Sequence, residues 1–178
     1  MRIALFAAAA ALAAAAPVSA ALAPGARAPD FTTRAAIAGQ VFTLNLRSQL
    51  KKGPVVLYFF PAAFTSGCNA EAKAFAEAVD RFKAAGATVI GMSADPVEKL
   101  QRFSREHCAG RFAVASAGPA VIRGFDVALA RPAGGGGAAL TSRTSYVIAR
   151  DGRVRFVQAD VAPAEHVRAT LAAVQAMR

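Results

Sequence analysis

The sequence has few cysteines, no tryptophan and little charge, and each scarcity excludes a class of protein. Its 178 residues include 2 cysteines and 2 tyrosines, and 18% of them are charged. Two cysteines cannot staple a disulfide-rich mini-protein or supply a zinc site of four thiolates. With no tryptophan and only two tyrosines, an aromatic-rich binding surface is also unexpected. The low charge and the 55% hydrophobic content instead predict one compact domain with a real core, and argue against disorder.

The formal net charge of +10 raises the question of nucleic-acid binding. The Lys and Arg residues are spread along the whole chain, and the densest clusters are Lys51-Lys52 and the pair Arg102 and Arg105. Only Phe103 stands among these clusters, and one ring does not form a stacking platform. We therefore predict a surface that attracts anions in general and no nucleic-acid partner.

Residues 1–20 have the layout of a secretory signal peptide. A basic start at Arg2 precedes an apolar run over 3–16, and small residues at 17–20 favour cleavage after Ala20. As a helix the apolar run would span about 21 Å, short of the roughly 30 Å hydrocarbon core, so no stable membrane anchor is expected. We predict a mature domain over 21–178 that is exported, either to a periplasm or as a secreted protein.

The mature chain alternates β-prone apolar runs with apolar residues at helical spacing. The expected elements are a hairpin within 31–44 that turns at Gly39-Gln40, strands 55–60 and 88–93, helices 70–85 and 95–107, a short strand 112–116, a short helix 119–124, a hairpin from 145–149 across Asp151-Gly152, and a helix 163–177. Asp95 is expected to cap its helix, with Pro96 at the first position. This order predicts an α/β fold of the thioredoxin-like type, in which helices flank a central mixed β-sheet that follows an N-terminal β-hairpin.

The loop between the strand 55–60 and the next helix carries the most informative residues. Cys68 falls in or beside the first turn of that helix, where unpaired backbone N–H groups favour a thiolate over a thiol. Helix N-termini can lower a cysteine pKa from about 8.5 to roughly 3.5–7.5. Thr65 offers a hydroxyl donor, and Pro61 can wall a pocket because it has no N–H. Position alone leaves an inert buried cysteine, or half of a structural disulfide, equally open.

The spacing Pro61-x-x-x-Thr65-x-x-Cys68 resembles the signature of the peroxiredoxins, the thiol peroxidases of the alkyl hydroperoxide reductase C/thiol-specific antioxidant family. Glu71 falls where the bacterioferritin-comigratory-protein branch of that family has a pocket glutamate. Further segments resemble the family in the correct order, at residues 25–31, 91–95, 141–148 and 151–153. The resemblance therefore covers nearly all of the mature chain.

The resemblance implies a thiol-dependent reduction of hydrogen peroxide and organic hydroperoxides at Cys68, without a cofactor. A thiolate that attacks a peroxide oxygen passes negative charge to the departing oxygen, so the site needs hydrogen-bond donors. Arg143, carried over from the family, would contact the sulfur and the peroxide, since its guanidinium stays charged and offers several donors. Glu71 would orient Arg143 through an ion pair, while Thr65 and Pro61 would shape the pocket.

The product at Cys68 would be a sulfenic acid, which another thiol must resolve. Many members of the branch carry a second cysteine five residues after the first, but this chain has Lys73 there. The resemblance favours Cys108 as the resolving cysteine, because some members place theirs in the corresponding helix. A partner's thiol, a bridge between two chains and a bystander role for Cys108 stay open. The reductant is expected to be a thioredoxin-like protein, a glutaredoxin-like protein or a low-molecular-weight thiol, and the protein a monomer or homodimer.

Two other functions compete with the peroxidase. A periplasmic thiol–disulfide oxidoreductase on the same fold would normally use Cys-x-x-Cys, but Thr65 stands three residues before Cys68. A non-catalytic thioredoxin-like domain would use a Cys68–Cys108 bridge as a structural staple. No metal is expected, since only the adjacent His107 and Cys108 are close in sequence among the histidines and cysteines. The glycine run at 134–137 lacks the Lys-Ser/Thr of a phosphate loop and predicts a flexible loop.

Overall fold

The computed structural model describes residues 21–129, 140–159 and 161–177. The predicted signal peptide over 1–20 and the glycine run at 134–137 lie outside the described residues and stay predictions. Within the described ranges, no helix combines the length and the apolar character that crossing a bilayer requires.

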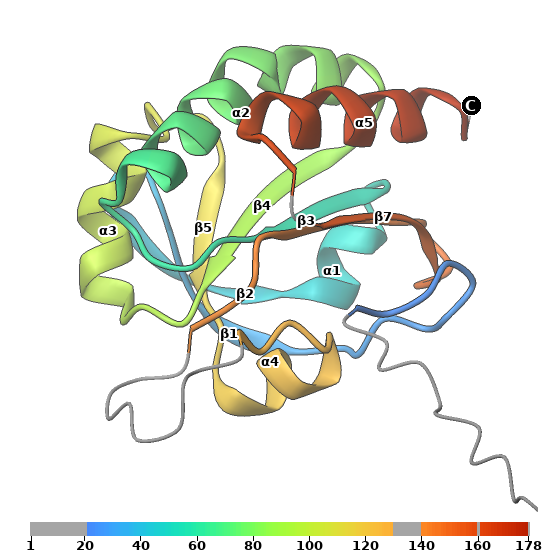
Figure 1. The fold of residues 1–178 in the computed structure, drawn as a ribbon, viewed down its shortest axis with the longest axis horizontal. Coiled ribbons are helices and arrows are strands. Elements are labelled where there is room, and N and C mark those ends of the chain that lie inside the picture. The colour runs from blue at the N-terminus through green and yellow to red at the C-terminus, as the bar shows by residue number, and fades with distance from the viewer. Residues whose placement is uncertain (1–20, 130–139, 160, 178) are drawn as a thin grey trace, which may run out of the picture.

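The fold is a seven-stranded mixed β-sheet with helices on both faces (Figure 1), as the order of elements predicted. The strand order is β2-β1-β5-β4-β3-β6-β7; β3, β4 and β5 run parallel, and the other pairs are antiparallel. The strands are β1 (Thr32–Ile37), β2 (Gln40–Asn45), β3 (Val55–Phe59), β4 (Thr88–Ser93), β5 (Ala113–Ser116), β6 (Thr144–Ile148) and β7 (Val154–Ala159). The helices are α1 (Leu46–Leu50), α2 (Ser66–Ala84), α3 (Val97–Glu106), α4 (Pro119–Gly124) and α5 (Pro163–Gln175).

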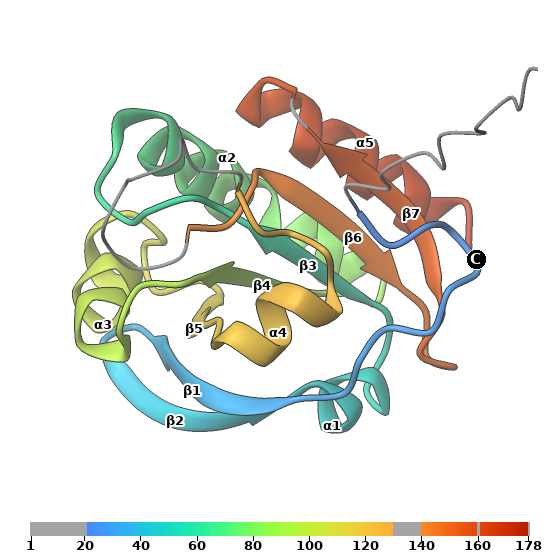
Figure 2. The same ribbon diagram turned by 60° about the horizontal axis from the view of Figure 1, so that its bottom comes forward.

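The central strand β3 is buried on both faces, and its side chains alternate between two cores. Val56 and Tyr58 pack with α2, α3 and α5, whereas Leu57 and Phe59 pack with α1 and α4. Figure 1 shows α2 and α5 side by side along one side of the sheet, and Figure 2 brings α4 forward on the other. The continuous apolar run of β3 therefore reflects a strand that never meets solvent.

The observed elements match the expected ones closely, with differences at their ends. The first hairpin turns at Ala38-Gly39, one residue earlier than expected, and both residues have positive φ (49° and 78°) as a tight two-residue hairpin requires. Helix α2 begins at Ser66, four residues before the expected start at Ala70. Helix α1 was not expected, because its five residues are too few for a periodic pattern; the Asn45 side chain caps it by accepting from the Ser48 N–H at 2.8 Å.

The expected capping of α3 by Asp95 is wrong. The N-cap position belongs to Pro96, which is extended (φ −65°, ψ 152°), and the helix begins at Val97. The carboxylate of Asp95 instead accepts a hydrogen bond from the backbone N–H of Ala63, at 2.6 Å. A long-range partner in the loop after β3 has thus replaced the local capping partner that the sequence pattern indicated.

Candidate active site

The pairing of β3 with β6 brings the loop that carries Cys68 next to Arg143. These strands are antiparallel, and Phe59 at the end of β3 pairs with Thr144 at the start of β6. The residues that follow β3 and the residues that precede β6 therefore lie at the same edge of the sheet. A buried hydrogen bond from Thr141 Oγ1 to the carbonyl of Phe60, at 2.7 Å, ties the two segments together.

Cys68 lies in the first turn of α2 and is 2% exposed. The helix is 19 residues long and begins two residues before Cys68. The first N–H groups of a helix have no intrahelical acceptor, and the helix dipole places partial positive charge there. Negative charge on the Cys68 sulfur is therefore favoured by its position, as the sequence indicated.

Arg143 bridges Cys68 and Glu71 with the two arms of its guanidinium. Its Nη2 donates to the Cys68 sulfur, with 3.6 Å between Nη2 and Sγ, and its Nη1 donates to Oε2 of Glu71. Glu71 is fully buried, and the Arg143 side chain is 18% exposed. The structure thus contains the three-residue arrangement that the resemblance implied for these positions.

Glu71 is an unusual carboxylate because of its burial. Burial raises the pKa of Glu71 from its ordinary 4.5 to about 7, although the neighbouring Arg143 acts to lower it. Its second oxygen, Oε1, has no hydrogen-bond partner among the described residues. Burial thus disfavours the ionised form of Glu71, while the ion pair with Arg143 favours it.

Gly67 is a contributor to this site that the sequence reasoning missed. A Cβ added at Gly67 would come within 3.2 Å of Nη2 of Arg143, the nitrogen that donates to Cys68. The absence of a side chain therefore leaves room for the guanidinium beside the helix start. The available signal was a glycine directly before the cysteine in a helix's first turn, where glycine has no propensity advantage.

The structure places Thr65 and Pro61 on the loop before Cys68, with the Thr65 hydroxyl turned to its own loop. Thr65 is the exposed N-cap residue of α2, and its hydroxyl donates to the carbonyl of Ala62 at 3.0 Å. No hydrogen bond joins Thr65 to Cys68 or Arg143 within the described part of the chain. Pro61 is half-buried at the start of the loop. The hydroxyl is thus held by its own loop.

Phe64 anchors the same loop to α3. Its backbone has a positive φ of 69°, which is uncommon for a residue other than glycine. Its ring packs edge-on against Phe103 and His107, with 5.4 Å between centroids in each case, and the guanidinium carbon of Arg102 lies 5.7 Å from the ring centre. The loop before Cys68 is therefore coupled to the final turn of α3.

Cys108 lies just beyond that final turn and is fully buried. Burial in apolar surroundings raises the pKa of the Cys108 thiol well above its ordinary value. Both cysteines are free and belong to the same hydrophobic cluster. Tyr58 belongs to the same cluster and is fully buried, and burial raises the pKa of its hydroxyl.

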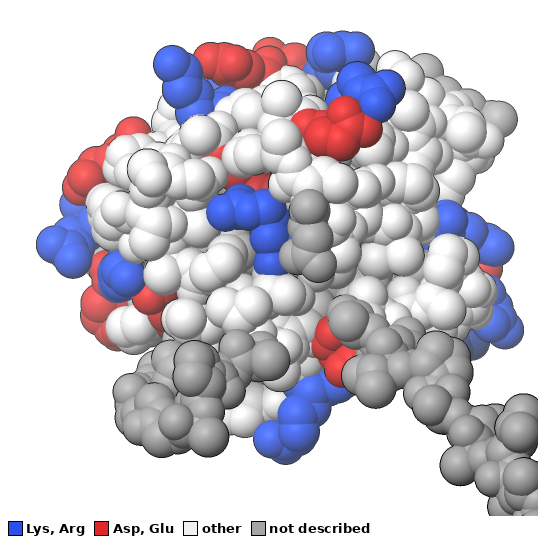
Figure 3. Space-filling view, viewed as in Figure 1, with Lys and Arg blue, Asp and Glu red and all other residues white. Residues whose placement is uncertain are grey.

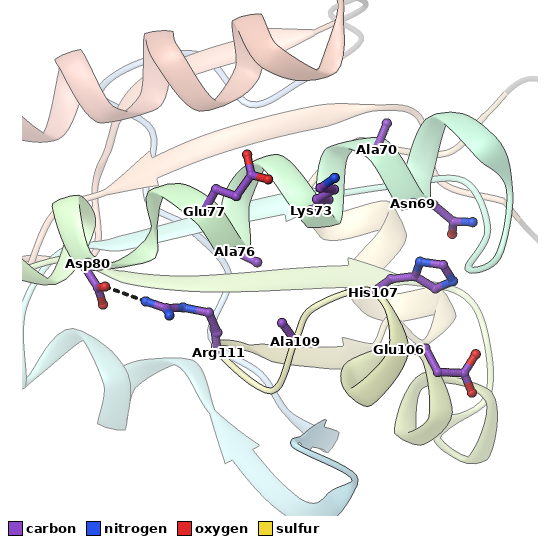
Figure 4. Close-up of a pocket in the computed structure, with 10 residues that line it drawn as sticks. All are labelled: Asn69, Ala70, Lys73, Ala76, Glu77, Asp80, Glu106, His107, Ala109 and Arg111. Carbon is purple, nitrogen blue, oxygen red and sulfur yellow. Dashed lines mark hydrogen bonds and ion pairs between the residues drawn. The ribbon is translucent and has the colours of Figure 1, made fainter.

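A groove of about 600 Å³ runs between α2 and the chain that follows α3 (Figure 4). Its walls come from the two segments that carry the cysteines, although neither cysteine lines it. The residue in place of the branch's commonest second cysteine, Lys73, lies on the α2 side. The lining residues are Asn69, Ala70, Lys73, Ala76, Glu77, Asp80, Glu106, His107, Ala109 and Arg111.

The surface agrees with the expectation of scattered charge. On the face shown in Figure 3, basic side chains are interspersed with acidic ones, and no continuous basic patch covers it. No group of three or more His, Cys, Asp or Glu side chains suited to a metal ion occurs among the described residues.

Comparison with known proteins identifies the family. The model of the AhpC/TSA family matches residues 24–157. Peroxiredoxin Q of Oryza sativa subsp. japonica, a chloroplastic protein, is 33% identical over 154 residues, which are 86% of this chain and 67% of that protein. The crystal structure of peroxidoxin BcpB from Mycobacterium tuberculosis superposes with a TM-score of 0.77 at 29% identity, covering 87% of this chain and 97% of that one.

A second solved structure, peroxiredoxin Q from Xanthomonas campestris, superposes with a TM-score of 0.70 at 28% identity and covers 80% of this chain and 89% of that one. Matches in sequence, family model and fold thus agree with one another and with the geometry around Cys68. The chain belongs to the AhpC/TSA family and is a thiol-dependent peroxidase, a peroxiredoxin that resembles the bacterioferritin comigratory proteins.

Proposed function

We propose that Cys68 is the thiolate that reduces the peroxide, and that hydrogen peroxide and organic hydroperoxides are its substrates. The observation that carries this assignment is the 3.6 Å contact of Arg143 Nη2 with Cys68 Sγ at the N-terminus of α2. Support for organic substrates comes from the bacterioferritin comigratory protein of Xanthomonas campestris, a solved structure 28% identical to this chain, which is described as having alkyl peroxide reduction activity.

The chemistry is a displacement at oxygen. The Cys68 sulfur donates an electron pair to the nearer peroxide oxygen, an S–O bond forms and the O–O bond breaks. The departing oxygen leaves as alkoxide or hydroxide and takes a proton, so that cysteine is oxidised to sulfenic acid and the peroxide is reduced to an alcohol or water. Arg143 donates to the oxygen that gains charge, and Thr65 can exchange the Ala62 carbonyl for a peroxide oxygen.

The test is stopped-flow consumption of hydrogen peroxide and of cumene hydroperoxide by the wild type and by Cys68→Ser. We expect the wild type to consume both and Cys68→Ser to lose at least about a thousandfold in rate, since the nucleophile is gone. Cys108→Ser is the matched control, because it removes the other thiol and should keep the rate of the first turnover. Equal rates in the wild type and Cys68→Ser would reject the assignment.

We further propose that Cys108 resolves the sulfenic acid within the same chain. The Cys108 thiol would attack the Cys68 sulfur, forming an S–S bond and releasing water. Both cysteines lie in one hydrophobic cluster, and Cys108 sits beyond the end of α3, where few helical bonds must break. Solved structures of the Xanthomonas campestris peroxiredoxin Q include variants with serine at one or the other of two cysteines.

Mass spectrometry after one equivalent of peroxide tests this step. We expect the loss of two hydrogens from the intact chain and a peptide that joins Cys68 to Cys108. Cys108→Ser should instead retain a sulfenic acid that a dimedone probe traps at Cys68. A disulfide between two chains, or over-oxidation of Cys68 beside an intact Cys108 thiol, would reject resolution within the chain.

We propose that the mature protein works outside the cytoplasm, because residues 1–20 have the layout of a signal peptide. Its reductant would then be an exported thioredoxin-like or glutaredoxin-like protein, or a low-molecular-weight thiol. Cell fractionation followed by N-terminal sequencing should find a chain that starts at Ala21 outside the cytoplasm. A full-length chain confined to the cytoplasm would contradict both the location and the cleavage site.

A further inference from the structure

The side chain of Asp95 connects the turn before α3 to the loop before Cys68. Its Oδ2 accepts from the backbone N–H of Ala63 at 2.6 Å and from the hydroxyl of Ser93 at 2.7 Å. Its Oδ1 accepts from Nζ of Lys99 at 2.8 Å. These hydrogen bonds lower the pKa of Asp95 against the opposing effect of its burial, so the carboxylate stays ionised at neutral pH.

The contact with Ala63 is the one that reaches the active-site loop. Ala63 is 2% exposed, so water cannot replace Asp95 as the acceptor for its N–H. Without the Asp95 carboxylate, this N–H would be a buried donor with no acceptor. A buried donor without an acceptor is strongly unfavourable, and a loop relieves it by changing conformation. The position of the Ala63 peptide therefore depends on the Asp95 carboxylate.

The residue after Ala63 shows why this dependence matters. Phe64 holds a positive φ of 69°, and such a conformation persists only where the surroundings enforce it. Asp95 holds the peptide between Ala62 and Ala63, one residue before Phe64, while Phe103 and His107 hold the ring of Phe64. Directly after Phe64, the carbonyl of Thr65 accepts the helical bond from Asn69 N, at 2.8 Å, around the turn that contains Cys68.

We infer that Asp95 is a positioning residue of the peroxide site. By holding the N–H of Ala63 it keeps Phe64 in its left-handed conformation, and this conformation sets the start of α2, so that Cys68 faces Arg143. Asp95 touches neither the sulfur nor Arg143, and acts only through the loop. The inference rests on the proposed role of Cys68 and adds a residue from the neighbouring strand-to-helix turn.

The experiment compares Asp95→Ala and Asp95→Asn with Lys99→Met, all in the Cys108→Ser background. Lys99→Met is the matched control, because it removes the ion pair and leaves the acceptor for Ala63 in place. Three readouts are measured for each variant: the rate of peroxide reduction, the rate at which iodoacetamide alkylates Cys68 at pH 7, and the midpoint of thermal unfolding. The alkylation rate does not depend on peroxidase activity.

We expect Asp95→Ala to lower the peroxide and alkylation rates by about tenfold or more. Asp95→Asn should recover part of both rates, since its amide oxygen can still accept from Ala63. Lys99→Met should lower the unfolding midpoint and keep both rates within about twofold of the parent.

Two results would overturn the inference. One is an Asp95→Ala protein that keeps both rates, and the other is a Lys99→Met protein that loses them as much as Asp95→Ala does. If Asp95→Ala does not fold, Asp95→Asn against Lys99→Met decides in the same way. Failure of the parent to consume peroxide would count against the proposed role of Cys68, whereas the alkylation rates would still decide the role of Asp95.

Discussion

The surroundings of the two cysteines differ in charge far more than in burial. Cys68 is 2% exposed and Cys108 is fully buried, so solvent access hardly separates them. Cys68 lies at the positive end of a long helix and contacts Arg143, whereas Cys108 lies beyond the opposite, negative end of α3. Among the described residues no basic side chain donates to Cys108, and burial raises its pKa. Local charge, and not exposure, therefore separates Cys68, the proposed attacking thiol, from Cys108, the proposed resolving thiol.

Alkylation of the two cysteines is the most direct test of this difference in local charge. At pH 7 we expect iodoacetamide to modify Cys68 at least about 100-fold faster than Cys108, because the thiolate is the reacting form. The rates are read from the peptides of each cysteine by mass spectrometry at a series of times. Similar rates at the two positions would show that the charge difference has no chemical consequence.

Removing the cation should make the two cysteines more alike. Arg143→Met keeps much of the side chain's length and loses its charge and donors, and we expect peroxide reduction to fall about 100-fold, as when one oxyanion donor is lost. The measurement is the second-order rate with hydrogen peroxide. Arg168→Met, at an exposed arginine on α5, is the control and should retain the parent rate. A loss in both variants would point to net charge and not to the contact at the sulfur.

Glu71→Gln tests how the buried carboxyl beside Arg143 makes the free energy of unfolding depend on pH. The folded protein holds the Glu71 proton up to about pH 7, whereas the unfolded chain releases it near 4.5. The contribution of Glu71 to the free energy of unfolding is therefore full below pH 4.5 and falls as pH rises to 7. We expect urea unfolding of the wild type to show this fall and Glu71→Gln to lack it.

The same variant should lower peroxide reduction by only about fivefold, because glutamine can still accept from Arg143. Unfolding curves of wild type and variant that change with pH by the same amount would show that Glu71 titrates normally in the fold.

The smallest expected effect comes from Gly67→Ala. The added Cβ would come within 3.2 Å of Arg143 Nη2 and displace the guanidinium by a few tenths of an ångström. We expect peroxide reduction to fall about threefold with little change in stability. Gly118→Ala is the matched control, since a Cβ there meets nothing within 4 Å and it lies at the start of α4. Equal effects of the two substitutions would mean that the space beside Arg143 is unimportant.

The sequence predicted most of the fold because the signals involved are local. The apolar run of β3, the spacing of Phe75, Val79 and Phe82 on α2, and the Asp151-Gly152 turn all follow from neighbouring residues. Helix α1 was not predicted, because five residues are too few to show a helical spacing of apolar side chains. Asp95 was assigned to a helix cap because sequence proximity favoured that partner, while Ala63, 32 residues away, was invisible to a local pattern.

The candidate site likewise has features that the sequence predicts locally and contacts that depend on long-range packing. A cysteine at a strand-to-helix junction, three residues after Thr65, is legible in the sequence, and so is its resemblance to the peroxiredoxins. The contact between Arg143 and Cys68, 75 residues apart, exists only because β3 and β6 pair in one register. The fit of that guanidinium beside Gly67 follows from the same packing.

The amino-acid sequence by itself determined which residues can react, where the strands and helices form, and the positive helix end at which Cys68 lies. Those properties depend on covalent chemistry and on hydrogen bonds between near neighbours. Only the tertiary structure decided that Arg143, Glu71 and Asp95 lie around that region, and that Cys108 is buried in the same hydrophobic cluster as Cys68. Charge and burial depend on distances in space, and the folding of the sheet brings distant segments within hydrogen-bond reach.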